Sequence, residues 1–303
     1  MATLKQKKIT PQDLVRVSGD PEFFVAKVSK TGVNRKKIIP ICGLLGGTKE
    51  EPIPIPGCNP GYMMQEDGVA VEFNFPPAHS PDHFQSYVAC AFSNLERHLA
   101  SIGLSAVTKT SHHEFTEKEL ATPAAMRIGC SPDADAYARK PREGISVELM
   151  GRERFTAGHF HISFPNPHSI PNYVYVRMLD AFLGLPFVPR DKQGSRRKFY
   201  GLAGLYRDTK YPDGSTGLEY RTMSNFWVTD ALAAQRMAQT IMYLFASINK
   251  NIDMAAKFFD MIPWADVKNA IDTESDDDAR KIYDLILANS RGLMTPVVSF
   301  GGK

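Results

Sequence analysis

The stretch GVAVEFNFPP, residues 68–77, gives the first indication of the fold. Side chains along a strand alternate between its two faces, so the apolar residues of this stretch share one face, whereas Glu72 and Asn74 share the other. Two prolines then end the strand, because proline lacks the N–H that a β-ladder requires. The strand therefore offers one face to a core and places a carboxylate and an amide on the opposite face.

Three further stretches repeat this pattern of an apolar face opposed by chemically reactive side chains. Their polar faces carry Asp20 and Glu22, then His159 and His161, then Glu219 and Arg221. A half-exposed antiparallel strand also shows polar residues to water, but these residue types are the ones that bind metal ions and phosphates. If the strands are neighbours, one face of their sheet is apolar and covered by helices, and the other holds carboxylates, imidazoles and a guanidinium.

The helical part of the chain follows from the spacing of apolar residues. Residues 82–102 repeat apolar side chains at helical spacing, and Gly103 ends the pattern. We expect further helices over residues 172–183, 229–249 and 276–289. Strands and loops therefore dominate the first two-thirds, and residues 229–303 are mostly helical. Because the sequence shows no repeat or linker, it predicts one α+β domain over residues 1–303.

Composition and charge exclude several classes of protein. Of 303 residues, 43% are hydrophobic, which is enough for a packed core and excludes wholesale disorder. The chain has 36 basic and 33 acidic residues, a net charge of +3. This balance argues against a protein that coats DNA through many phosphate contacts, so no nucleic acid partner is required. Short basic runs at residues 35–37 and 196–198 are candidate anion sites or solvated surface.

Sequence features also address location and redox state. No apolar run approaches the roughly 20 residues that span a bilayer, and the basic N-terminus lacks the apolar stretch of a secretion signal. The four cysteines are far apart and form no C-x-x-C pair, so we expect reduced thiols in the cytoplasm. The glycine-rich residues 43–49, GLLGGTK, miss the spacing of a phosphate-binding P-loop, and no dinucleotide-binding fingerprint follows a strand.

The polar faces together indicate a class of chemistry. Glu22, Glu72 and Glu219 with a histidine suit hard divalent cations such as Mg²⁺, which commonly keeps substrate phosphates among its ligands. Arg207 and Arg221 can bind phosphate oxygens in a bidentate way. This combination is typical of phosphoryl transfer from a nucleotide. Two histidines and a glutamate would equally describe a non-haem iron or zinc site.

Six blocks of sequence sharpen this interpretation. They are GDPEFF at residues 19–24, QEDGVAVEFNFPP at 65–77, GCSPD at 129–133, AGHFH at 157–161, YGLAGLYR at 200–207 and GLEYR at 217–221. In this order, they resemble the motifs of the phage amidoligases of the carboxylate–amine ligase type 2 family, which belongs with glutamine synthetase and glutamate–cysteine ligase. The resemblance covers residues from about 15 to 230 and leaves the helical C-terminal third without a motif.

The resemblance implies a glutamine synthetase-like catalytic fold, an antiparallel sheet curved around the active site and backed by helices. It also implies an enzyme that joins a carboxylate to an amine through an acyl-phosphate, with ATP as the phosphate donor and Mg²⁺, or Mn²⁺ in its place, bridging the phosphates. The substrates would be a small-molecule or peptide carboxylate and an amine, and an oligomer is compatible with the family. A phage-encoded member would act in the cytoplasm of its host.

The resemblance also assigns roles to residues. The metal ligands it implies are Glu22, Glu72, His159 and Glu219, with Asp20 as a weaker candidate and His161 as the alternative histidine or a phosphate contact. The residues implied for phosphate are Arg207, Arg221 and Lys198, although Lys198 fits loop surface equally well. Glu66 or Asp67 would take the proton of the incoming amine. Asp133 recurs in the motif without a mechanism, and Asn74 stands where some relatives have an acid.

Two other functions stay open at this point. One is a metal-dependent oxygenase or hydrolase that uses His159, His161 and Glu219 and is indifferent to ATP. The other is a non-enzymatic nucleotide-binding or phage assembly protein, which would bind ATP without releasing ADP.

Overall fold

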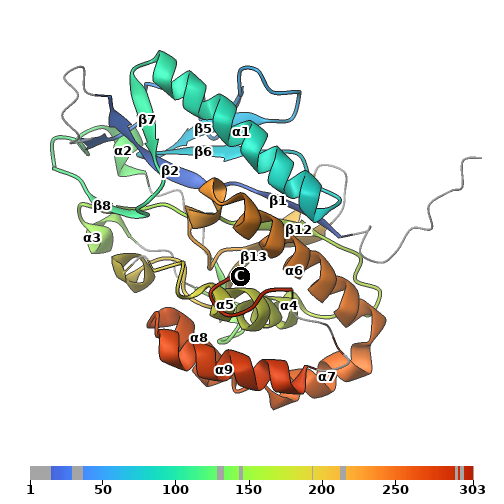
Figure 1. The fold of residues 1–303 in the computed structure, drawn as a ribbon. Coiled ribbons are helices and arrows are strands. Elements are labelled where there is room, and N and C mark those ends of the chain that lie inside the picture. The colour runs from blue at the N-terminus through green and yellow to red at the C-terminus, as the bar shows by residue number, and fades with distance from the viewer. Residues whose placement is uncertain are drawn as a thin grey trace, which may run out of the picture.

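The computed structural model describes residues 15–28, 37–127, 133–142, 146–192, 194–211, 216–290, 293 and 297–302. Within these residues the protein combines antiparallel sheets with helices, which confirms the predicted α+β class (Figure 1). Of the sequence blocks discussed above, residues 129–132 lie outside the described residues, as do Arg35 and Lys36.

The first sheet has six strands in the order β1-β12-β14-β13-β9-β10. These strands are β1 (Arg16–Gly19), β12 (Phe160–Ser163), β14 (Thr216–Tyr220), β13 (Leu205–Lys210), β9 (Ala134–Asp135) and β10 (Lys140–Pro141). All pairings are antiparallel, and the register sets His161 opposite Glu219, with Arg207 opposite Glu219 on the next strand. The predicted polar positions of β12, β13 and β14 are therefore direct neighbours.

The second sheet has the order β3-β2-β6-β5-β4, and a further strand, β7, pairs with β2. Its strands are β2 (Glu22–Lys27), β3 (Ile38–Ile39), β4 (Ile53–Pro54), β5 (Met63–Asp67), β6 (Ala70–Asn74) and β7 (Leu104–Val107). Glu22 lies opposite Glu72, and Glu72 lies opposite Gln65. A separate two-stranded sheet joins β8 (His112–Glu114) to β11 (Glu153–Phe155).

The division into two sheets differs from the single curved sheet that we expected. Gly19 pairs with Phe160 in the first sheet, and Glu22 pairs with Glu72 in the second, so residues 19–22 pass from one sheet to the other. Pro21 sits between them and has no N–H to continue a ladder. The ladder is interrupted there, and the chain continues into the second sheet.

Helices cover the sheets. They are α1 (Pro81–Ser101), α2 (Pro123–Met126), α3 (Val147–Met150), α4 (Asn172–Leu179), α5 (Leu185–Phe187), α6 (Ala231–Lys250), α7 (Ile252–Met261), α8 (Trp264–Asp272) and α9 (Asp276–Asn289). A π-helical turn, Asp180–Gly184, continues α4, and short 3₁₀ turns span Gly194–Lys198 and Asn225–Thr229. The four helices predicted from spacing are present, and α1 runs beside α6 (Figure 1). The sequence did not predict α7 and α8.

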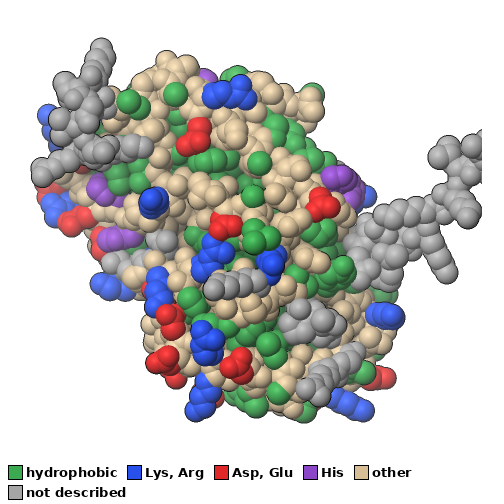
Figure 2. All heavy atoms as spheres, viewed as in Figure 1, with side chains coloured by type: hydrophobic (Ala, Val, Ile, Leu, Met, Phe, Trp, Pro, Cys, Tyr) green, Lys and Arg blue, Asp and Glu red, His purple; other side chains and the backbone are tan. Residues whose placement is uncertain are grey.

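One hydrophobic core joins both sheets to the C-terminal helices. At its centre the indole of Trp227 lies 4.9 Å from the ring of Phe160, and Phe160 lies 5.7 Å from the ring of Phe84 on α1 (centroid distances). Among the described residues, no helix is both long and apolar enough to cross a membrane. On the face seen in Figure 2, basic side chains are interspersed with acidic ones.

Candidate functional site

Residues 19–22, which connect the two sheets, contribute two carboxylates to two different groups of side chains. Gly19 packs so closely that a Cβ there would lie 2.8 Å from the carbonyl oxygen of His159, so the backbones touch. Asp20 comes directly after the last residue of β1 in the first sheet, and Glu22 is the first residue of β2 in the second sheet. This short segment therefore contributes one carboxylate, Asp20, to one cluster of side chains and another, Glu22, to a second cluster.

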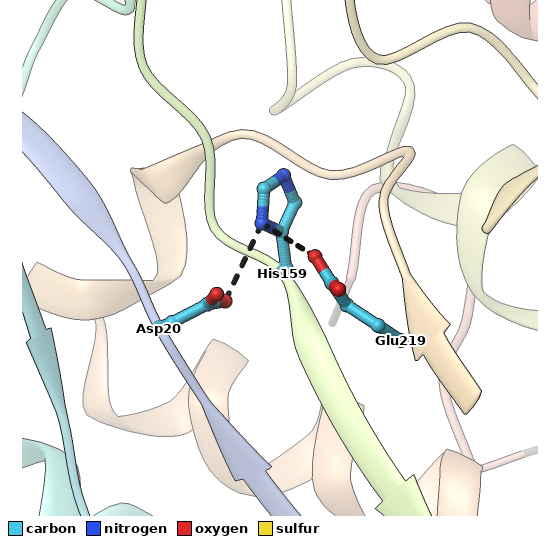
Figure 3. A group of neighbouring side chains, drawn as sticks. All are labelled: Asp20, His159 and Glu219. Carbon is cyan, nitrogen blue, oxygen red and sulfur yellow. Dashed lines mark ion pairs between the residues drawn. The ribbon is translucent and has the colours of Figure 1, made fainter. Parts of the chain in front are cut away.

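The first cluster consists of Asp20, His159 and Glu219 (Figure 3). Nδ1 of His159 lies 3.4 Å from Oδ1 of Asp20 and 3.2 Å from Oε1 of Glu219. Each residue offers a ligand atom, and these atoms lie within 4.8 Å of one another. His161 lies beside this cluster, with its Nε2 3.2 Å from the other oxygen of Asp20. The structure thus brings together residues that the strand pattern placed on one face.

Two arginines border the first cluster. The guanidinium of Arg221 donates to Glu219 and to the hydroxyl of Tyr200, and its Nε lies 2.8 Å from Oδ1 of Asp133. Arg207 donates from Nη1 to Oε2 of Glu219 over 3.2 Å. The contact to Arg221 gives Asp133 the structural role that its motif did not explain. The negative charges of this cluster are therefore already opposed by guanidinium groups.

The surroundings shift the pKa values of the two histidines in opposite directions. Burial and the nearby Arg221 lower the pKa of His159, whose Nε2 lies 3.0 Å from Oη of Tyr200. Burial acts against the charged form of His161 too, but the carboxylates of Asp20 and Glu219 outweigh it and raise its pKa. His159 is thus the histidine that favours a neutral ring, the form that binds metal ions.

The second cluster consists of Glu22, Asp67 and Glu72, whose ligand atoms also lie within 4.8 Å of one another. Nε2 of Gln65 donates to Glu72 over 2.6 Å, and the backbone N–H of Ala157 donates to Glu22 over 3.1 Å. Burial, together with the charge of Asp67, raises the pKa of Glu22 to about 8. Burial and neighbouring carboxylates also raise the pKa of Glu72. This cluster carries more negative charge than its surroundings oppose.

The sequence analysis missed Lys49, which lies at the edge of the second cluster. Its ammonium is 3.3 Å from Oδ2 of Asp67, and its side chain is 48% exposed. Burial alone would lower its pKa, but Asp67, Glu72 and Glu22 raise it. The sequence feature that could have indicated this lysine is the glycine-rich stretch at residues 43–49. It lacks the spacing of a P-loop, but it ends in the lysine that reaches the site.

Glu66 explains the conformation of that stretch. Its carboxylate accepts hydrogen bonds from the backbone N–H groups of Gly43 (2.7 Å), Leu45 (2.8 Å) and Gly46 (3.4 Å). Gly43 and Gly46 have positive φ angles, which glycine adopts without steric cost. Glu66 therefore holds a loop and lies outside the second cluster, unlike its neighbour Asp67.

The basic run at residues 196–198 divides between two environments. Lys198 is exposed and makes no contact with either cluster among the interactions found in the described residues. Arg196 and Arg197 are buried. Arg196 donates to three backbone carbonyls, and Arg197 pairs with Asp191. These two arginines are therefore structural, which corrects the interpretation of the run as surface or an anion site.

The donor atoms of the clusters indicate which ions they could hold. The second cluster offers three carboxylates, and hard cations such as Mg²⁺ and Mn²⁺ prefer oxygen ligands. The first cluster offers two carboxylates and an imidazole beside two guanidinium groups. Its cationic rim suits an anionic ligand such as a phosphate better than the second cluster does.

Comparison with known proteins shows that part of the chain is similar to a known family. Residues 148–260 match the family model described as "Phage phiEco32-like COOH.NH2 ligase-type 2", a name that indicates a carboxylate–amine ligase. No curated protein matches the chain. The matched residues include His159, Arg207, Glu219 and Arg221, whereas Glu22 and the rest of the second cluster lie before them. The resemblance predicted from the motifs is confirmed over residues 148–260, where the chain is similar to the phage phiEco32-like carboxylate–amine ligase type 2 family.

Proposed function

We propose that the protein is an ATP- and Mg²⁺-dependent ligase that joins a carboxylate to an amine through an acyl-phosphate. One observation carries this proposal: an acid-rich cluster and a guanidinium-rimmed cluster meet at residues 19–22. Acyl-phosphate chemistry needs cations around the phosphates and a proton acceptor for the amine. The two clusters lie next to each other and contain residues that suit both requirements.

The acid-rich second cluster fits the metal. Glu22 and Glu72 would hold a divalent ion, and a cation there would offset the burial and carboxylate repulsion that raise the pKa values of these two residues. Such an ion would supply charge neutralisation to the phosphates of ATP. The first cluster would add His159 and Glu219 as further ligands, as the family resemblance implies.

Arg207 and Arg221 differ in exposure, and we assign them different roles. The side chain of Arg207 is 25% exposed, whereas that of Arg221 is 3% exposed. Arg207 would therefore meet the transferred phosphate directly. Arg221, held by Glu219, Asp133 and Tyr200, would keep a fixed positive charge beneath it. A charge that is already oriented stabilises a transition state without reorganising during the reaction.

Asp67 is our candidate for the group that accepts the proton of the amine. It is the carboxylate of the second cluster that contacts Lys49, and its side chain is 13% exposed. Glu66, the other residue that the sequence suggested, is engaged by three backbone N–H groups. The glutamine synthetase-like fold, the single catalytic domain and the small-molecule or peptide substrates belong to the same proposal.

The test measures ADP and amide formation with ATP and Mg²⁺ across a panel of amino acids, peptides and amines. We expect one acid–amine pair to give ADP and amide in equal amounts. The variants Glu72→Gln and Arg221→Lys should lower the rate by about 100-fold or more. The first removes a carboxylate that would hold the metal, and the second loses the guanidinium that Glu219, Asp133 and Tyr200 orient. Glu96→Gln, at an exposed glutamate on α1, is the matched control and should leave the rate unchanged.

An isotope experiment tests the intermediate. A substrate carboxylate labelled with ¹⁸O attacks the γ-phosphate through one labelled oxygen, so one label should appear in the released inorganic phosphate. Amide formation without label in the phosphate would contradict the acyl-phosphate. ATP binding without ADP under every acid–amine pair would contradict the ligase activity.

A further inference from the structure

Two cysteines lie in contact away from the site. Sγ of Cys58 is 3.7 Å from Sγ of Cys90, although the residues are 32 positions apart in sequence. Cys58 belongs to the loop between β4 and β5, and Cys90 lies on α1. Both side chains are thiols and are half-buried, so small reagents can reach them. The spacing of the cysteines in the sequence gave no sign of this pair.

The backbones on both sides of the pair are held in place. Gly57 has a φ angle of 84°, and a Cβ there would lie 2.5 Å from Oδ1 of Asn94, so the loop presses against α1. Cys58 donates its N–H to the carbonyl of Ile55 over 3.1 Å. On the helix, Nδ2 of Asn94 donates to the carbonyl of Cys90 over 2.8 Å. The sulfur atoms therefore stay close without needing a large movement of either element.

The surroundings distinguish the two sulfur atoms. Nδ2 of Asn94 also points at Sγ of Cys90 over 3.7 Å, and the guanidinium of Arg97 donates to Oδ1 of the same asparagine. A donor of this kind stabilises a thiolate. Burial and the adjacent Cys90 raise the pKa of Cys58 to about 11, which keeps Cys58 protonated at neutral pH. Cys90 is therefore the better nucleophile.

We propose that Cys58 and Cys90 form a reversible disulfide by exchange with low-molecular-weight disulfides. The thiolate of Cys90 attacks one sulfur of the small disulfide, forms a mixed disulfide and releases one small thiol. Cys58 then loses its proton, attacks Sγ of Cys90 and releases the second small thiol. Two protein thiols are oxidised, and one small disulfide is reduced to two thiols.

The disulfide would connect the β4–β5 loop to α1. The loop leads directly into β5, the strand that carries Gln65 and Asp67. The cross-link would restrict this connection and raise the midpoint of thermal unfolding by several degrees, since a closed loop reduces the freedom of the unfolded chain. This inference does not depend on the proposed ligase activity.

The test exposes the reduced, folded full-length chain to oxidised glutathione, blocks remaining thiols by alkylation and maps the peptides by mass spectrometry. We expect a peptide pair joined through Cys58 and Cys90, lighter by two hydrogens than the reduced peptides, and complete reversal by dithiothreitol. The variants Cys58→Ser and Cys90→Ser should lose the cross-link, while Cys42→Ser, at another half-buried cysteine, should keep it.

The variants also separate the two steps. In Cys58→Ser, Cys90 should accumulate a stable mixed disulfide with glutathione, because the second thiol is missing. In Cys90→Ser, Cys58 should react at least tenfold more slowly. The proposal is overturned if both cysteines remain alkylatable in excess oxidised glutathione, if each carries its own glutathione, or if the cross-link forms only after denaturation.

Discussion

Lys49 places an ammonium group beside the three carboxylates of the second cluster. It lies 3.3 Å from Asp67 and is half-exposed, so it can move away when another cation enters. We expect Lys49→Met to tighten the binding of Mn²⁺ by roughly two- to fivefold, since a partly exposed ion pair contributes up to about 1 kcal/mol. Direct titration with Mn²⁺, followed by its magnetic resonance signal, measures this change.

Lys37→Met is the matched control for this titration. Lys37 is exposed and pairs with Glu119, which belongs to neither cluster. Its loss should leave Mn²⁺ affinity unchanged. Weaker binding of Mn²⁺ by Lys49→Met would show that the ammonium supports the cluster instead of competing with the metal.

The buried carboxyl group of Asp180 should make the free energy of unfolding depend on pH. It is fully buried, accepts hydrogen bonds from Tyr220 (2.7 Å) and Thr222 (3.3 Å), and burial raises its pKa to about 7. The folded protein therefore holds a proton that the unfolded chain loses near pH 4. Stability should fall as the pH rises from about 4 to about 7, by at most about 4 kcal/mol, and then stay low.

Asp180→Asn keeps a carbonyl acceptor for Tyr220 and removes the titration. Glu22 and Glu72, whose pKa values are also raised, contribute to the pH dependence of both proteins. Between pH 5 and pH 8, the free energy of unfolding, measured with denaturant, should therefore fall by about 2–3 kcal/mol less in the variant than in the parent. Asp260→Asn, at an exposed aspartate on α7, should retain the parent's dependence. Equal pH dependence in Asp180→Asn and the parent would mean that Asp180 is ionised in the folded protein throughout.

At the residue scale, alternation along strands was a good guide to which side chains share a face. It predicted that Glu22, Glu72, His159 and Glu219 point away from the core, and these residues lie in the two clusters. It could not predict Lys49, because a half-exposed lysine in an irregular loop has no periodicity. Nor could alternation predict that Asp133 contacts Arg221, since this ion pair joins distant parts of the chain.

The loop at residues 43–49 is an element held by one side chain. Glu66 accepts three backbone hydrogen bonds from it, and hydrogen bonds to a charged group contribute about 1.5–3 kcal/mol each. We expect Glu66→Gln, which keeps one acceptor oxygen and loses the charge, to destabilise the loop by about 2 kcal/mol. Amide hydrogen exchange at Gly43, Leu45 and Gly46 should then accelerate by at least tenfold.

The control for the loop is Glu51→Gln, at an exposed glutamate of the same region. Its exchange pattern should match that of the parent. Unchanged protection in Glu66→Gln would mean that the loop is held by its packing, for example by Gly47, where a Cβ would lie 2.9 Å from the carbonyl of Met64.

Elements with strong local signals were predictable. The helix expected over residues 82–102 is α1, Pro81–Ser101, whose Ser80 cap accepts the N–H of His83 over 3.2 Å. The helix expected over 276–289 is α9, with three aspartates in its first turn. One residue, Asn251, separates α7 from α6, and Ile262 and Pro263 separate α7 from α8. These helices are short, so a search for long apolar repeats did not find them.

The arrangement of the whole molecule was the hardest part to predict. The polar strands were expected to share one sheet, but strand pairing depends on contacts between distant residues, which period-two patterns do not specify. The structure divides them between two sheets and uses residues 19–22 as the connection. The clusters then lie next to each other because this short connection supplies Asp20 to the first and Glu22 to the second.

The single domain predicted from the sequence can be tested through the two tryptophans of the chain. Trp227 is fully buried beside Phe160 of the first sheet, and Trp264 begins α8 in the helical C-terminal third. Because one hydrophobic core joins both sheets to the C-terminal helices, we expect both parts to unfold together. In the single-tryptophan variants Trp264→Phe and Trp227→Phe, the fluorescence transition should coincide with the circular dichroism transition of the same variant. A fluorescence midpoint for Trp264 well below the circular dichroism midpoint would instead assign the C-terminal helices to a separate folding unit.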